Sequence, residues 1–323
     1  MAAKKQSEDE FLELWAKYKS ITEIAKVTGM DMRSVGRRRR AVEEKLKITL
    51  SPQITFGAAQ SENSNKPQRL NLGIENGTVL VFSDAHFWPT IRTTALKGLL
   101  WAINEFKPKA VICNGDAFDG ASISRHPRIG WDQTPSVIQE LKACQAALGE
   151  IEEAAKKARH NAKLIWPLGN HDARFETRLA NTAPEFASVS GFTLKDHFPN
   201  WEPCWSVWIT DEVIVKHRYK GGVHATHNNT VNSGKSIVTG HLHSLKVTPF
   251  NDYGGNRFGV DTGTLADPDG PQFAYAEQNP QNHRSGFAVL NFTDGKLLWP
   301  ELVHRWGEGT IEFRGQLYDV GGL

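Results

Sequence analysis

Three short apolar segments, separated by longer stretches with helical character, restrict the fold more than any other feature of this sequence. The segments are residues 78–83, 110–114 and 162–166, and the stretches between them are residues 91–106 and 136–159. Apolar runs of this length predict buried strands. A strand–helix–strand–helix–strand order predicts parallel strands whose faces are covered by helices.

After about residue 200, the apolar runs follow one another without long helical stretches between them. Strands are predicted at residues 205–210, 213–217, 236–239, 245–249, 257–261, 286–292 and 297–303. The Thr-Asp-Gly-Lys sequence at 293–296 predicts a hairpin turn. We expect these strands to form a second sheet packed on the first, so the predicted fold class is α/β, a two-sheet β-sandwich flanked by helices.

The N-terminal residues 7–47 predict a small all-α unit, because apolar residues recur there at helical spacing. Ser20 or Thr22 can cap a second helix that ends at Gly29, and a third helix is predicted at about 31–46. The spacing of small, turn and apolar residues across these helices resembles a helix-turn-helix motif.

Residues 51–77 are rich in Ser, Asn, Gln, Pro and Gly, and this composition predicts a flexible linker. The predicted organisation is therefore a helix-turn-helix-like domain at 1–50, the linker, a large domain at 78–306 and a C-terminal tail at 307–323.

The composition excludes some classes of protein. The formal net charge of +2 by itself indicates no particular partner. Cys113, Cys144 and Cys204 form no CxxC pair and are odd in number, which indicates reduced thiols. No apolar run resembles a signal peptide or is long enough to span a membrane. We expect a cytoplasmic protein without membrane contact, and the sequence leaves its oligomeric state open.

Polar side chains that can bind metals or transfer protons follow the predicted strands. They lie in the segments Asp-Ala-His at 84–86, Gly-Asp-Ala-Phe-Asp at 115–119, Gly-Asn-His-Asp at 169–172, His217, and Gly-His-Leu-His at 240–243. Loops after parallel strands meet at one sheet edge, where the ligand sites of α/β proteins collect. Asp, Asn and His without Cys suit divalent Mn, Fe, Zn or Ni. The sequence therefore predicts a transition-metal site.

In this order, the motifs resemble the calcineurin-like metallophosphoesterase signature D-x-H, G-D-x-x-D, G-N-H-[DE], H and G-H-x-H. The resemblance covers about residues 78–305 and implies hydrolysis of a phosphate ester by a hydroxide activated by two divalent ions, with Mn preferred. One ion is expected at Asp84, His86, Asp116 and His243, and the other at Asp116, Asn170, His217 and His241. Asp116 would bridge the ions, which should lie about 3.5–4 Å apart.

The resemblance also implies that His171 is the general acid for the leaving alkoxide and that Asp119 orients it. A structural role for His171 is the alternative. His217 is the least secure ligand, because many members of the family have glycine at the next position and this chain has arginine there. His224 and His227 are alternatives, but they are expected in a Gly- and Asn-rich loop, whereas His217 ends an apolar strand.

Two departures from the family pattern bear on the substrate. Protein Ser/Thr phosphatases of the superfamily have arginine where this chain has Gly120, and His-Gly-Gly where it has His217-Arg-Tyr. A protein phosphatase is therefore disfavoured. Residues 122–135, which include Arg125, His126, Arg128 and Trp131, follow a metal loop and form either a phosphate clamp or a solvated loop.

A run of four arginines, Arg37, Arg38, Arg39 and Arg40, lies on the third predicted helix. Residues 31–47 contain seven Lys or Arg and three Asp or Glu, so the segment is positively charged. In a helix-turn-helix this helix enters the major groove of DNA, and a protein-interaction module is the alternative. We therefore expect a phosphodiesterase or nuclease acting on nucleic acid, similar to bacteriophage phosphoesterases. The alternatives are a phosphomonoesterase or cyclic-nucleotide phosphodiesterase, and a DNA-binding regulator whose phosphoesterase fold senses a ligand.

Overall fold

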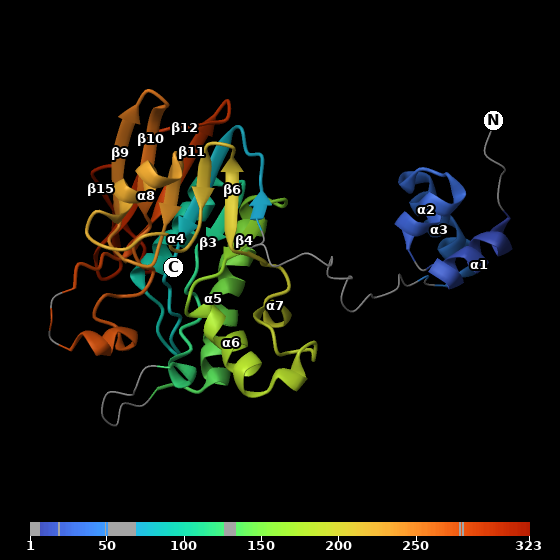
Figure 1. Cartoon of the computed structure of the whole chain (residues 1–323), viewed down its shortest axis with the longest axis horizontal. Coiled ribbons are helices and arrows are strands. Elements are labelled where there is room, and N and C mark those ends of the chain that lie inside the picture. The colour runs from blue at the N-terminus through green and yellow to red at the C-terminus, as the bar shows by residue number, and fades with distance from the viewer. Residues whose placement is uncertain are drawn as a thin grey trace. The chain divides into compact units, whose positions relative to one another are not determined.

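The computed structural model describes residues 7–18, 20–48, 50, 69–125, 134–277, 279 and 281–323. The chain divides into two compact units, Met1–Ser64 and Asn65–Leu323. Residues 51–68 of the linker predicted at 51–77 lie outside the described residues. So do His126, Arg128 and Trp131 of the segment at 122–135. Figure 1 shows the smaller unit in blue and the larger one in the remaining colours.

The N-terminal unit has the three predicted helices, α1 (Glu8–Tyr18), α2 (Ile21–Thr28) and α3 (Met32–Leu46). The hydroxyl of Ser20 accepts a hydrogen bond from the Glu23 N–H and caps α2, and Gly29 ends it in the left-handed conformation with φ 71°. The helices enclose a small core of Phe11, Trp15, Ile24, Val35 and Val42.

The larger unit contains a nine-stranded sheet, and the strands at one end of it are parallel, as predicted. Its parallel strands are β2 (Gly77–Phe82), β3 (Ala110–Cys113), β4 (Lys163–Pro167) and β5 (Glu202–Cys204). The connecting helices are α4 (Thr94–Phe106) and α5 (Val137–Ala158), close to the predicted ranges.

The remaining strands of this sheet correct two predictions. They are β11 (Gly286–Thr293), β12 (Lys296–Leu297), β13 (Glu301–Gly307), β14 (Thr310–Phe313) and β15 (Gln316–Asp319). The segments at 286–292 and 297–303 were expected in the second sheet, but β11 pairs with β2 and β13 pairs with β11. β11 is buried along most of its length, which requires neighbours on both sides. The expected tail at 307–323 is the β14–β15 hairpin, and the predicted turn at 293–296 is confirmed by the pairing of Phe292 with Leu297.

The second sheet has six strands in the order β1-β6-β7-β8-β10-β9. Their bounds are β1 (Arg69–Asn71), β6 (Ser206–Thr210), β7 (Val213–Val215), β8 (Ser236–Thr239), β9 (Lys246–Asp252) and β10 (Gly255–Asp261). A helix absent from the prediction, α8 (Ala225–Ser233), packs on β8, β9 and β10 (Figure 1). The predicted linker extended too far, because β1 pairs with β6 and Ile74 is buried in the core.

The two sheets face each other across one hydrophobic core, and helices cover the other face of the larger sheet. Side chains alternate along β2: Val79 and Val81 pack between the sheets, whereas Leu80 and Phe82 pack under the helices. β2, β3 and β4 run parallel, so their carboxyl ends lie at one edge, and the loops that follow them start there.

Short helices complete the larger unit. They are α6 (Asp172–Thr182), α7 (Leu194–His197) and the 3₁₀ helices η1 (Ala121–Ile123), η2 (Pro184–Phe186) and η3 (Pro271–Ala276). Within the described part of the chain, every helix is too short or too polar to cross a bilayer.

Candidate metal centre

The predicted ligands lie in loops that follow strands of both sheets. They are Asp84 and His86 after β2, Asp116 after β3, Asn170 after β4, His217 after β7, and His241 and His243 after β8. Strands β2, β3 and β4 belong to the nine-stranded sheet and β7 and β8 to the six-stranded sheet. The site therefore lies where loops from the two sheets meet.

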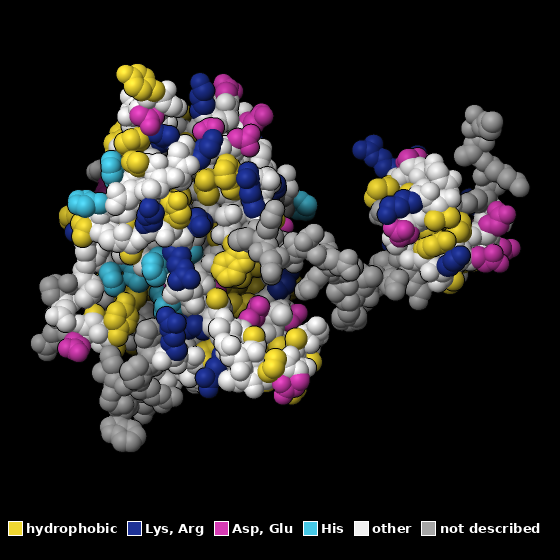
Figure 2. All heavy atoms as spheres, in the orientation of Figure 1, with side chains coloured by type: hydrophobic (Ala, Val, Ile, Leu, Met, Phe, Trp, Pro, Cys, Tyr) yellow, Lys and Arg dark blue, Asp and Glu magenta, His cyan; other side chains and the backbone are white. Residues whose placement is uncertain are grey.

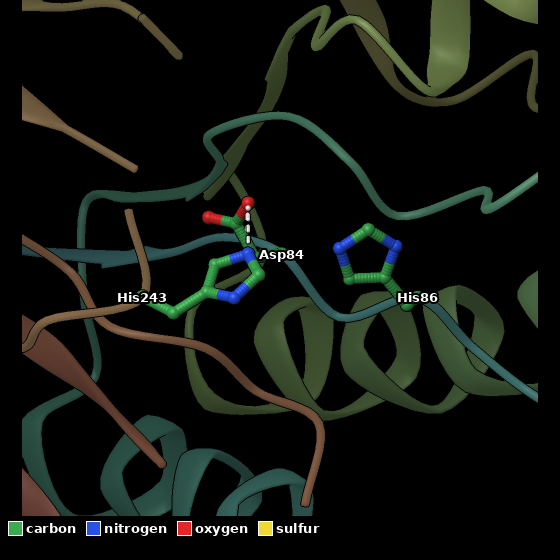
Figure 3. A group of neighbouring side chains, drawn as sticks. All are labelled: Asp84, His86 and His243. Atoms are coloured by element: carbon green, nitrogen blue, oxygen red, sulfur yellow. Dashed lines mark hydrogen bonds and ion pairs between the residues drawn. The ribbon is translucent and has the colours of Figure 1, made fainter. Parts of the chain in front are cut away.

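Two groups of these side chains bring their ligand atoms within 4.8 Å of one another. Asp84, His86 and His243 form the first group, which Figure 3 shows with His243 hydrogen-bonded to Asp84. Asp116, His217 and His241 form the second. The first group belongs to the ligand set predicted for one ion, and the second group belongs to the set predicted for the other ion.

The distances within and between the groups suit neighbouring cations. His243 Nε2 lies 3.0 Å from Asp84 Oδ1, and His217 Nε2 lies 3.0 Å from Asp116 Oδ2. Ligand atoms that bind one ion at about 2.0–2.2 Å must lie roughly 3 Å apart. His217 Nε2 is also 4.0 Å from Asp84 Oδ1, so the two groups are adjacent.

Unpaired buried atoms in the groups support the same interpretation. His86 Nε2 and Asn170 Oδ1 have no hydrogen-bond partner among the described residues. Buried polar atoms normally have a partner, and a bound cation would supply one. His86 Nδ1 lies 2.8 Å from Asp119 Oδ1, and His217 Nδ1 lies 2.8 Å from the Asn114 carbonyl oxygen. If each Nδ1–H donates to that oxygen, each Nε2 keeps a lone pair for a metal.

Two glycines of the motifs are required by the closeness of the ligands. A Cβ on Gly169 would lie 1.9 Å from Asp116 Oδ1, and a Cβ on Gly240 would lie 2.5 Å from Asp84 Oδ2. Any side chain at these positions would displace a carboxylate. The glycines before Asn170 and His241 therefore allow the loops to approach one another.

The backbone of the site is strained. Five predicted ligands that are not glycine have positive φ: Asp84, His86, Asp116, His241 and His243, with φ between 40° and 72°. This conformation costs a non-glycine residue roughly 1–2 kcal/mol. Strain of this kind collects at functional sites, where the surrounding structure maintains it.

Comparison with known proteins agrees with this geometry. The Metallophos family, described as calcineurin-like phosphoesterase, matches residues 77–255. The chain belongs to this family. The match covers the loops that contain every predicted ligand, and the two-sheet architecture with flanking helices is the expected metallophosphoesterase fold.

Solved structures with a similar fold are distant in sequence. Vps29 complexed with Zn²⁺ from Entamoeba histolytica is 14% identical, covers 75% of this chain and 99% of its own, and has a TM-score of 0.38. A dimetal phosphatase from Danio rerio is 9% identical over 72% and 96%, with a TM-score of 0.32. A protein serine/threonine phosphatase from Saccharomyces cerevisiae is 12% identical over 75% and 85%, with a TM-score of 0.37. No curated protein sequence matches the chain.

The carboxylates of this phosphoesterase create a strongly cation-attracting site. Burial acts to raise the pKa of Asp84, but His243 and His217 outweigh it and hold the pKa at about 2. Burial also acts to lower the pKa of His217, yet Asp116 and Asp84 raise it to about 10. A metal ion that binds His217 must displace this proton, so metal binding should release protons.

Asp172 organises two of the loops, although nothing in the sequence beyond the Gly-Asn-His-Asp motif indicates a role for it. Its buried carboxylate accepts hydrogen bonds from five N–H groups, on Asp116, Ala117, Phe118, Gly169 and the Trp166 indole. Burial and the charge of Asp116 raise its pKa to about 6, against the effect of the hydrogen bonds. The carboxylate thus joins the loops that carry Asp116 and Asn170.

Asp119 and His171 lie together, as predicted from the resemblance. Asp119 Oδ1 is 2.8 Å from His171 Nδ1 and 2.8 Å from His86 Nδ1, so one carboxylate contacts both rings. Burial acts to lower the pKa of His171, but the hydrogen bond to Asp119 raises it overall. The Arg174 guanidinium lies 3.0 Å from His171 Nε2. Because a guanidinium only donates, Nε2 is the acceptor in this arrangement.

His224 and His227, the alternative ligands to His217, do not belong to either group of ligand atoms. His224 and His227 are exposed, and the His227 ring packs on Phe250. The expectation that they lie in a loop was wrong for His227, which is in α8. Among the described residues, neither belongs to a group that could hold a metal ion.

One further histidine, His283, lies beside a predicted ligand but is not predicted from the sequence. The ring of His283 packs against the ring of His243, with 4.5 Å between centroids, and burial lowers its pKa to about 4. Its position before β11 follows no ligand motif, so the sequence contains no signal for it.

The four arginines proposed for DNA are not equivalent. Arg37 and Arg40 are exposed on α3. Arg39 forms an ion pair with Glu43 at 3.0 Å, and its guanidinium lies over the Trp15 ring. Arg39 therefore packs on the helical unit itself and is a poor phosphate ligand.

Proposed function

We propose that this chain is a metal-dependent phosphodiesterase that acts on nucleic acid. The observation that carries the proposal is the position of His171 Nε2, 4.0 Å from Asp116 Oδ2, beside two adjacent groups of ligand atoms. A histidine that a carboxylate orients thus lies within reach of an ester held at the centre. Two divalent ions bound there would lower the pKa of a coordinated water and offset the negative charge on phosphate.

The ligand residues of the chain have separate tasks in this proposal. Asp84, His86 and His243 hold one ion, and His217, His241 and Asn170 hold the other. Asp116 belongs to the second group, and its partner His217 lies 4.0 Å from Asp84 of the first group. The Asp116 carboxylate is therefore suited to both ions.

His171 acts as the acid. Asp119 holds Nδ1, so Nε2 is the atom that gives a proton to the leaving oxygen. Arg174 donates to that nitrogen in this structure, and its guanidinium must turn away before Nε2 can carry a proton. The negative charge of a bound phosphate would favour that movement.

Nucleic acid is the favoured substrate class because α3 presents Arg37 and Arg40 to solvent in a three-helix unit. Such a unit would bring the catalytic unit to a polymer. A small-molecule phosphodiesterase and a ligand-sensing regulator remain as outcomes of the test below.

The test is a substrate panel assayed on the full chain with Mn²⁺. The panel contains p-nitrophenyl phosphate, bis(p-nitrophenyl) phosphate, cyclic nucleotides, and single- and double-stranded DNA. We expect the diester and DNA to be cleaved faster than the monoester. Preference for the monoester or a cyclic nucleotide would replace the proposal with the small-molecule alternative, and DNA binding without cleavage of any ester would favour the regulator.

The role of His171 is tested on two leaving groups. His171→Asn should retain metal but reduce turnover roughly 10²–10⁴-fold on DNA, and less on the nitrophenyl diester, whose leaving group needs little protonation. His227→Asn, which changes an exposed histidine on α8, is the matched control. Equal losses on both substrates would show that His171 is structural.

A further inference from the structure

A pocket of about 460 Å³ opens beside the metal centre and is rich in arginine. Its lining includes Arg125, Arg174, Arg178 and Arg218, together with the predicted ligand Asn170. Among the described residues, no Asp or Glu lines it. Figure 2 shows Lys and Arg side chains beside a group of His side chains on this unit.

The arginines reach the pocket from separate parts of the chain. Arg174 and Arg178 lie one turn apart on α6, whereas Arg125 follows η1 and Arg218 follows the strand that leads to His217. Side chains at i and i+4 share a helix face, so the α6 pair points to the same side. The convergence is therefore a product of the tertiary fold.

The four arginines of the pocket form no ion pair with any residue that the structure describes. Arg125, Arg178 and Arg218 are exposed. Arg174 donates to the Asp119 carbonyl oxygen and to His171 Nε2, so none of its bonds neutralises its charge. Like charges that converge without counter-charges repel one another, and an anion would relieve that repulsion.

We propose that this pocket binds a second phosphate group of the substrate, next to the ester that is cleaved. Guanidinium groups pair with phosphate through parallel N–H···O bonds, and four arginines line this pocket. Asn170 belongs both to this pocket and to the predicted ligand set, so a substrate can occupy pocket and centre at once. The inference rests on the proposed function, because it concerns the same substrate.

The second phosphate could belong to the neighbouring nucleotide of a strand or to a small bisphosphate. The two sources share the same chemistry and differ in what separates the phosphates. In both cases Arg174, which contacts His171, would connect occupancy of the pocket with the residue proposed as acid.

The experiment uses the Mn²⁺-loaded full chain and three thymidine dinucleotides: TpT, the 5′-phosphorylated pTpT and the 3′-phosphorylated TpTp. We expect one phosphorylated dinucleotide to exceed TpT in kcat/KM by roughly tenfold or more, the size of one charge-assisted contact. Arg178→Ala and Arg218→Ala should each reduce this preference several-fold, and the double variant should abolish it. Both side chains are exposed, so the variants should fold.

Arg314→Ala is the matched control, because it removes one guanidinium from the β14–β15 hairpin of the same unit and should leave the preference unchanged. The second-phosphate site would be overturned if the double replacement changed neither the dinucleotide ratios nor the hydrolysis of thymidine 3′,5′-bisphosphate. Failure to cleave any dinucleotide or bis(p-nitrophenyl) phosphate would instead contradict the proposed function.

Thymidine 3′,5′-bisphosphate distinguishes the two sources. If the arginine replacements reduce its hydrolysis and leave the dinucleotide ratios as in the wild type, the site serves a small bisphosphate. If they change only the dinucleotide ratios, the site serves a strand.

Discussion

Replacing Asp172 by asparagine should destabilise the larger unit strongly, although the two side chains have nearly the same shape. Asp172 Oδ2 accepts three N–H bonds, and Oδ1 accepts the other two, from Ala117 and Phe118. An asparagine has one acceptor oxygen and one NH₂ group. In its better orientation the oxygen keeps the three bonds, and the NH₂ faces the N–H groups of Ala117 and Phe118.

The cost follows from those two unpaired donors. A buried N–H that loses its acceptor costs roughly 1–3 kcal/mol, so Asp172→Asn should lower the free energy of unfolding by about 2–6 kcal/mol. The opposite orientation leaves three donors unpaired and costs more. Because the residue is fully buried, water cannot replace the lost oxygen.

The assay is urea unfolding followed by tryptophan fluorescence at pH 8, where a carboxyl group with a pKa of about 6 is ionised. Chelator should be present, so that loss of metal does not contribute to the difference. Asp196→Asn is the matched control: Asp196 is exposed and accepts its bonds from Gly191 and Thr193 through one oxygen, which asparagine retains. We expect the control to change stability by no more than about 0.5 kcal/mol. If both variants unfold at the same urea concentration as the wild type, Asp172 does not organise the loops.

Three further predictions concern metal and DNA. Asp116→Asn should remove most of both divalent ions, measured by elemental analysis after reconstitution, and full occupancy in the variant would contradict a shared ligand. His217→Ala should empty one site, while His224→Ala and His227→Ala should leave both filled; the reverse result would show that the ligand was misassigned. In the full chain, replacing Arg37, Arg38 and Arg40 by Ala should weaken duplex binding and reduce the slope of log affinity against log salt by at most about three. Unchanged affinity and slope would reassign the helical unit to protein contacts.

The part of the fold predicted well from sequence is the part decided by local pattern. β2, β3 and β4 are short apolar runs flanked by helical periodicity, and each is followed by the polar residues of a motif. The caps of α2 were likewise visible, since Ser20 and Gly29 act within one turn of the helix. In such places neighbouring residues contain the whole signal.

The errors arose where a distant partner decides the outcome. β11 has the same apolar composition whichever sheet it joins, and its place beside β2 depends on a pairing across more than two hundred residues. β1 has only three residues and forms because β6 offers it an edge. The sequence predicts a tail in place of β14 and β15 because neither segment is apolar enough to predict a strand alone.

The candidate site shows the same division. The motifs gave the residue types, but the contacts of Arg174 with His171, and of one Asp119 oxygen with two rings, depend on side-chain positions that no spacing encodes. The positive φ of Asp84 and Asp116 was also invisible, because sequence rules assign that conformation to glycine. Favourable interactions elsewhere in the folded chain must offset this strain. The hydrogen bonds from the Asp116 and Gly169 N–H groups to the buried Asp172 carboxylate are suited to this role. We therefore infer that Asp172, which is not a predicted ligand, maintains the strained loop of Asp116. The geometry of the metal ligands then depends on a carboxylate that need not bind metal.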